Sequence, residues 1–133
     1  MSATSVSSVI NGRKVLRSFR FAGQGIVDLF RYENNAKVHL LIAGLVVAAG
    51  LWLRLSRVEW AIILTQIGLV WAAEALNTAI EKLCDFVSPG LHPKIKVIKD
   101  MSSGAVLILA IGAVVVGVVV LGGKAMEVFT VNQ

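Results

Sequence analysis

The segment from Met101 to Gly123 carries no charged side chain, and this feature most restricts how the chain can fold. A transmembrane α-helix needs about 20 predominantly apolar residues, so this segment is long enough to cross a bilayer. Of the 133 residues, 56% are hydrophobic and 16% are charged. A soluble domain of this length could not bury so much apolar surface in its own core. We therefore predict a single-domain, all-α integral membrane protein, and exclude a disordered chain, a disulfide-stapled secreted fold and a water-soluble enzyme.

Two further apolar segments predict two more transmembrane helices. The first lies between Lys37 and Arg54, whose long side chains can reach the interface at either end. The second is uncharged from Trp60 to Ala73 and continues with helical periodicity to Leu83. We expect transmembrane helices at residues 36–54, 58–84 and 99–123, a flexible tail at 1–12 and a second tail at 124–133.

The segment at residues 13–32 predicts a helix of a different kind. Its apolar residues recur at steps of three and four, and basic residues occupy the other positions. Such a helix is expected to lie in the membrane interface, although a helix on a soluble domain can have the same pattern. Lysines and arginines are concentrated before the first transmembrane segment and between the second and the third. The positive-inside rule therefore predicts a cytoplasmic amino terminus. Three transmembrane helices make a thin bundle, so we expect a homo-oligomer.

Acidic and amide side chains form a stripe along the second transmembrane segment. Glu74, Asn77, Glu81 and Asp85 are spaced three, four and four apart. At 100° per residue they lie within an arc of about 80°, along about 16 Å of helix. Carboxylates at the edge of the hydrocarbon must face partners, a cavity or an ion. Glu33 is expected at a similar cytoplasmic depth, just before the first transmembrane segment.

The residue types in this region suit phosphoryl transfer. Carboxylate oxygens favour Mg²⁺, which binds one or two carboxylates together with water and phosphate. A nearby lysine such as Lys99 can stabilise phosphate oxygens, and a free carboxylate can accept a proton from a lipid hydroxyl. Structural roles remain open for two of these residues. Glu81 could pair with Lys82 or with another basic group at a helix end, and Asn77 could serve as an interhelical hydrogen-bonding group.

Two sequence blocks together resemble the prokaryotic integral-membrane diacylglycerol kinase/undecaprenol kinase family. They are Glu74-Ala-Leu-Asn-Thr-Ala-Ile-Glu81 and Lys99-Asp100-Met-Ser-Ser-Gly-Ala-Val106, with Asp85 between them. The stretch Glu33-Asn-Asn-Ala resembles the upstream acidic motif of the family. The resemblance covers residues 13–123. It implies a homotrimer of three-helix subunits, with an amino-terminal surface helix and active sites shared between subunits.

The resemblance also implies a reaction and a set of site residues. Family members transfer the γ-phosphoryl group of ATP to a lipid alcohol at the cytoplasmic membrane interface, with Mg²⁺ as cofactor. Glu74 matches the catalytic base, and Asn77 matches a polar position that orients the active-site groups. Glu33 and Glu81 match the magnesium ligands, and Ser103 stands with Glu74 at the position of the lipid substrate. The residues implied in nucleotide binding are Lys14, Phe21, His92, Lys99 and Asp100.

Departures from the family pattern bear on the nucleotide contacts and on the acceptor. Lys14 and Phe21 stand where the family often has arginine and tyrosine, and lysine lacks the guanidinium fork. The loop from His92 to Asp100 resembles the undecaprenol kinase branch, so we favour undecaprenol over diacylglycerol. The implied location is the bacterial cytoplasmic membrane.

Two other functions compete with an active lipid kinase. A small oligomeric scaffold or a proton-conducting channel could use the acidic stripe as a path. However, the outer half of the second segment offers only Thr65 and Gln66 for such a path. A catalytically inactive descendant of a kinase is the third hypothesis, but every expected acidic position is filled.

Overall fold

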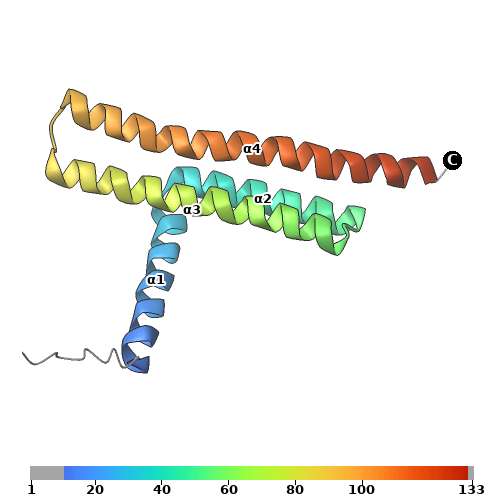
Figure 1. Cartoon of the computed structure of the whole chain (residues 1–133), viewed down its shortest axis with the longest axis horizontal. Helices are drawn as coiled ribbons and strands as arrows, with labels where there is room; N and C mark the ends of the chain where they lie inside the picture. The colour runs from blue at the N-terminus through green and yellow to red at the C-terminus, as the bar shows by residue number, and fades with distance from the viewer. Residues whose placement is uncertain (1–10, 132–133) are drawn as a thin grey trace, which may run out of the picture.

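A computed structural model describes residues 11–131 as four α-helices. No strand occurs within this range. The helices are α1 (Gly12–Tyr32), α2 (Asn34–Leu53), α3 (Arg57–Val87) and α4 (Pro93–Val131). Helices α2, α3 and α4 run side by side, whereas α1 projects away from them close to the start of α2 (Figure 1).

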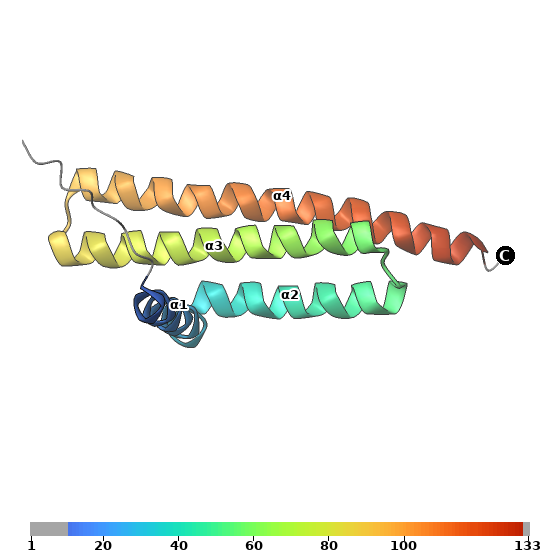
Figure 2. The ribbon, with the colours of Figure 1, turned by 60° about the horizontal axis from the view of Figure 1, so that its bottom comes forward.

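Helices α2, α3 and α4 are each long and apolar enough to cross a membrane. Many of their large apolar side chains are exposed, among them Leu41, Leu69 and Val115. Exposed apolar surface on long helices is stable against lipid or against other membrane helices. The chain is therefore a multi-pass membrane protein. Figure 2 shows its three long helices stacked side by side, with α3 between α4 and α2.

The turn between α2 and α3 is tightly packed. Arg54 ends α2 in the left-handed conformation, with φ of 57°, and the Leu55 backbone N–H donates to the Gly50 carbonyl at 3.1 Å. A side-chain carbon added at Gly50 would lie 2.8 Å from the Trp60 ring and 2.9 Å from Leu55. Glycine at this position therefore allows the end of α2 to approach the start of α3.

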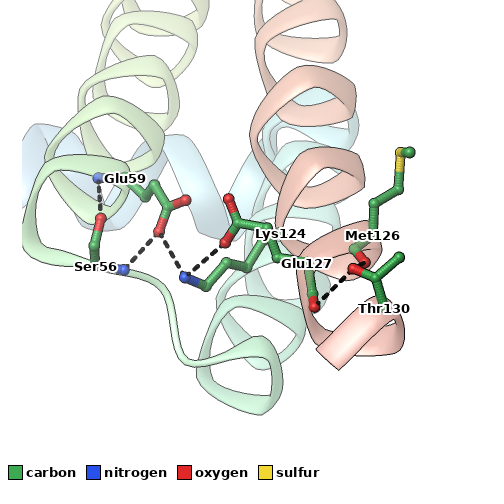
Figure 3. A network of polar contacts seen from close by, with 6 residues as sticks. All are labelled: Ser56, Glu59, Lys124, Met126, Glu127 and Thr130. Carbon is green, nitrogen blue, oxygen red and sulfur yellow. Dashed lines mark hydrogen bonds and ion pairs between the residues drawn. The ribbon is translucent and has the colours of Figure 1, made fainter. Parts of the chain in front are cut away.

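A polar network connects the start of α3 to the last turns of α4 (Figure 3). The Ser56 hydroxyl accepts the Glu59 backbone N–H, and the Glu59 carboxylate accepts the Ser56 backbone N–H, which is a capping box. Lys124 Nζ lies 3.8 Å from Glu59 Oε2 and 3.4 Å from Glu127 Oε2. These contacts join the two helices at the end opposite the loop that connects them.

The helices extend beyond the predicted transmembrane segments. Helix α4 begins at Pro93 instead of residue 99, because proline suits the first turn of a helix and the His92 ring Nδ1 accepts the Lys94 backbone N–H. It continues to Val131, so residues 124–131 of the predicted tail are helical; no proline or glycine follows Gly123 to end the helix. Residues 132–133 lie outside the described residues.

The amino-terminal part also differs from the predicted bounds. Residues 1–10 of the predicted tail lie outside the described residues, but Asn11 caps α1, because its side-chain oxygen accepts the backbone N–H groups of Arg13 and Lys14. Near the other end of α1, Leu29 is buried, and Phe30 packs edge-on against Trp71 with ring centroids 5.0 Å apart. These contacts attach the carboxyl end of α1 to the bundle. That α1 lies on the membrane surface stays a prediction.

The packing at Gly50 gives a test of the α2–α3 turn. We expect Gly50→Ala to lower the free energy of unfolding by about 1–3 kcal/mol, because the new methyl group would displace the Trp60 ring. Gly44→Ala is the matched control, because no atom lies within 4 Å of its added carbon and alanine favours the helix. Unfolding by dodecyl sulfate in mixed micelles measures both. Equal stability of the two variants would contradict the described turn.

Candidate functional site

Three polar side chains of α3 are buried where the helices meet. Glu74 and Asn77 are each 3% exposed, and Thr78 is 7% exposed. Burying polar groups in an apolar bundle is unfavourable unless other polar groups satisfy them. The placement of Glu74 and Asn77 therefore depends on the polar side chains that lie near this part of α3.

Asn77 connects α3 to α4 and also contacts the next acidic residue of its own helix. Its amide nitrogen donates to Glu81 Oε1 at 3.2 Å, and its amide oxygen accepts the Ser103 hydroxyl at 3.4 Å. The structure thus brings Asn77, Glu81 and Ser103 together, although they lie on two helices. The interhelical hydrogen-bonding role that was left open for Asn77 is present, and the same side chain orients Glu81.

Glu74 faces α2. Its carboxylate Oε2 lies 3.8 Å from the His39 ring Nε2, and the side chains are 4% and 21% exposed. Glu81 and Glu33 are close enough to act electrostatically on Glu74. Three of the predicted acidic residues, from α3 and from the α1–α2 junction, therefore lie in one electrostatic neighbourhood.

Glu33 is the short link between α1 and α2, and it pairs with α3. Its carboxylate Oε1 lies 3.0 Å from Lys82 Nζ. Lys82 therefore forms its ion pair with Glu33 and not with Glu81. Successive residues of a helix face different directions, and Lys82 points towards α1. Glu33 and Lys82 line a cavity of about 460 Å³ between α1 and α3, which Thr78 also borders.

The Lys99–Asp100 pair lies on the first turns of α4. Lys99 Nζ donates to Asp85 Oδ1 at 2.8 Å, and Asp100 pairs with Lys96 on its own helix. The Lys99–Asp85 contact joins α3 to α4 beside the loop and brings the fourth member of the acidic stripe into the polar region. The Asp85 side chain is 66% exposed and makes this ion pair at the surface of the two helices.

The other predicted nucleotide-binding residues lie apart from this cluster in the single chain. Lys14 and Phe21 are exposed on α1, whose amino-terminal half projects away from the bundle (Figure 1). His92 is exposed in the loop before α4, where its ring caps the first turn of that helix. The described chain does not bring these three side chains to Glu74.

Sequence reasoning missed two partners of the acidic residues. His39 lies inside the apolar segment between Lys37 and Arg54, and the sequence pattern assigns it no role; the pattern relates Lys82 only to its neighbour Glu81. A polar residue inside an otherwise apolar span was the available signal for His39. No signal in the sequence could pair Lys82 with Glu33, because their proximity arises from the docking of the α1–α2 junction on α3.

The carboxylates of this region suit a magnesium ion that takes most of its ligands from water and phosphate. Within residues 11–131 no group of three or more His, Cys, Asp or Glu side chains is arranged to hold a metal. Mg²⁺ is commonly bound by one or two carboxylates plus water and substrate phosphates. The oxygens of Glu33 and Glu81 therefore fit this chemistry, with the remaining positions left to phosphate and water.

The fold and the buried polar cluster define a multi-pass membrane protein with an acidic site between its helices. The chain matches the family model described as prokaryotic diacylglycerol kinase over residues 20–121. It is 36% identical over 107 residues to the undecaprenol kinase of Bacillus subtilis, covering 80% of this chain and 87% of that protein. The match to the diacylglycerol kinase of Escherichia coli K12 is 34% over 102 residues, covering 77% and 84%.

A diacylglycerol kinase from Synechocystis is 36% identical over 104 residues, covering 77% of this chain and 59% of that protein. These matches show that the chain belongs to the prokaryotic diacylglycerol kinase family, a family of lipid kinases. The resemblance drawn from the two sequence blocks is therefore confirmed.

Asn77 and Thr78 give a paired test of the buried contacts. Asn77→Ala leaves Glu81 and Ser103 without their partner, so we expect the free energy of unfolding to fall by about 1 kcal/mol. The Thr78 hydroxyl has no hydrogen-bond partner among the described residues, so Thr78→Val is expected to keep or raise stability. Dodecyl sulfate titration in mixed micelles measures both. A Thr78→Val variant less stable than Asn77→Ala would contradict this arrangement.

Proposed function

We propose that the protein transfers the γ-phosphoryl group of ATP to a membrane lipid alcohol at the cytoplasmic membrane interface. The observation that carries the proposal is the burial of the Glu74 carboxylate on a membrane helix, beside Glu81 and Glu33. Phosphoryl transfer depends mainly on positioning and on electrostatic stabilisation, and a buried acidic cluster at a fixed depth supplies both. Membership of a lipid kinase family supports the same reaction.

Glu74 is the general base in this proposal. Its carboxylate accepts the proton of the lipid hydroxyl while the hydroxyl oxygen attacks the γ-phosphorus and the bond to ADP breaks. Ser103 hydrogen-bonds to Asn77, one helical turn from Glu74, and this location suits contact with the lipid headgroup. Asn77 orients Glu81 through its amide nitrogen.

Glu33 and Glu81 would hold Mg²⁺, which neutralises phosphate charge when it is bound. Both residues carry carboxylates that act electrostatically on Glu74. Lys99 and Asp100 would bind the nucleotide. Lys99 is joined to Asp85, so its ammonium group is held at the α3–α4 end of the cluster.

We also propose that the site is completed by other copies of the chain in a homotrimer. Many large apolar side chains of α2–α4 are exposed, which suits packing between subunits as well as against lipid. Lys14 and Phe21 are remote from the Glu74 cluster in one chain, and they could reach the site of a neighbour from α1. Helix α1 would lie on the cytoplasmic surface of the bacterial inner membrane, with its basic residues towards anionic headgroups.

Undecaprenol is the acceptor that we favour, with diacylglycerol as the alternative. The loop from His92 to Asp100 supports undecaprenol through its resemblance to that branch of the family. Purified protein in mixed micelles with Mg²⁺ and γ-labelled ATP, offered each lipid in parallel, tests the choice. Label in neither lipid from a folded protein would overturn the proposed kinase and favour a scaffold or channel.

Glu74→Gln is expected to abolish lipid phosphorylation, because the amide keeps the shape of the side chain but cannot accept the proton. We expect a fall in turnover of about 100-fold or more, within the range for loss of a general base. The labelled-ATP assay measures turnover, and size-exclusion chromatography checks that the oligomer is intact. Wild-type turnover from an intact Glu74→Gln protein would remove Glu74 as the base.

Glu33→Gln and Glu81→Gln are expected to lower turnover and to raise the Mg²⁺ concentration needed for half-maximal activity, because each removes a negatively charged oxygen ligand. Titration with Mg²⁺ at fixed ATP measures the change. Glu127→Gln is the matched control, since Glu127 pairs with Lys124 at the opposite end of the α3–α4 pair. A wild-type Mg²⁺ response in both variants would contradict the metal assignment.

A further inference from the structure

His39 lies opposite Glu74 across the α2–α3 contact. Its Nε2 atom is 3.8 Å from Glu74 Oε2, and the Glu74 side chain is nearly inaccessible to solvent. Within residues 11–131, His39 is the only basic side chain that lies within 4 Å of this carboxylate. No other side chain in this range donates a hydrogen bond to Glu74. The ring is therefore the one described group placed to donate to the carboxylate.

The electrostatic setting makes such a donor necessary. Glu81 and Glu33, the other ionisable groups that act on Glu74, both add negative charge near it. A buried carboxylate with two acidic neighbours is unfavourable without a donor or a cation. An imidazole ring offers an N–H donor in its neutral form and two in its charged form. His39 can thus supply the hydrogen-bond donor that the negatively charged groups around Glu74 lack.

The surroundings of His39 bear on how its ring can turn. The ring also lines an apolar groove of about 550 Å³ between α2, α3 and α4, at the end of the groove nearest Glu74. Trp71 and Val70 line the same groove. Turning the ring into this groove would place a polar nitrogen among apolar side chains, whereas the observed position keeps Nε2 3.8 Å from the Glu74 carboxylate.

We propose that His39 is a positioning residue for Glu74. The His39 Nε2–H donates to Glu74 Oε2 and leaves Oε1 to accept the proton of the acceptor hydroxyl. As that O–H bond breaks, the hydroxyl oxygen forms the new bond to the γ-phosphorus, and ADP departs with the electrons of the bond that joined it to that phosphorus. Catalytic hydrogen bonds are often long before substrates bind and tighten in the complex. This inference rests on the proposed function.

Kinetics of two His39 variants test the role. We expect His39→Ala to lower kcat about tenfold or more, the effect of losing a hydrogen bond to a charged group, with KM for ATP and lipid within about twofold of wild type. His39→Gln keeps an N–H donor and is expected to recover most of kcat. Gln66→Ala is the matched control, because it removes another polar side chain from the same groove. Wild-type kcat in His39→Ala, or an equal loss in His39→Gln, would overturn the role.

A measurement without turnover separates this inference from the proposed function. In protein with ¹⁵N-labelled imidazole, the His39 ring signals are identified by their absence in His39→Gln. We expect Glu74→Gln to shift them and Thr65→Ala to leave them unchanged, because the Thr65 hydroxyl donates to its own helix at Ala61. No shift with Glu74→Gln would overturn the contact. If Glu74→Gln shifts the signals but the wild-type protein phosphorylates neither lipid, the proposed function is overturned and the contact between His39 and Glu74 still stands.

Discussion

A carboxylate on a membrane-spanning helix needs polar partners, and the arrangement of this chain depends on meeting that need at Glu74. The residue is 3% exposed in a bundle whose other buried positions are mostly apolar. Because desolvating an unpaired carboxylate is strongly unfavourable, the helices around α3 must bring polar groups to the same depth. Helix α2 brings His39, and Asn77 and Ser103 extend the polar region towards α4.

The α3–α4 hairpin provides the frame for this polar region. Lys99 and Asp85 join the helices beside their loop, and Lys124 and Glu59 join them near the other end. Single exposed ion pairs contribute little stability, so the packing along the length of α3 and α4 sets the register of the two helices, and these pairs lie at its two ends. A fixed register is what allows Ser103 on α4 to meet Asn77 on α3.

Helix α1 contributes to the site through its carboxyl end. Phe30 packs against Trp71, and the following link places Glu33 beside Lys82. The cavity between α1 and α3 lies next to these groups, on the side of α3 away from α4. Two hollows therefore border residues of this region: Glu33 lines the cavity, and His39, the partner of Glu74, lines the groove between α2, α3 and α4.

The sequence by itself determined the three apolar helices, the acidic stripe and the family. These follow from local properties: the length of uncharged runs, the 100° step of a helix and the spacing of Glu74, Asn77, Glu81 and Asp85. Helix ends were less well predicted, because hydropathy marks the apolar core of a helix and not its caps. Lys124 and the turns after it are helical although they are not part of the apolar run.

Only the tertiary structure decided which side chains meet across helices. Two such contacts join residues on different helices: His39 with Glu74, and Ser103 with Asn77. A third joins Lys82 on α3 to Glu33, which links α1 to α2. Such pairings depend on helix rotation and register, which are set by packing over the whole length of the bundle. A spacing rule within one helix carries no information about the rotation of the next, so these contacts could not be read from the sequence.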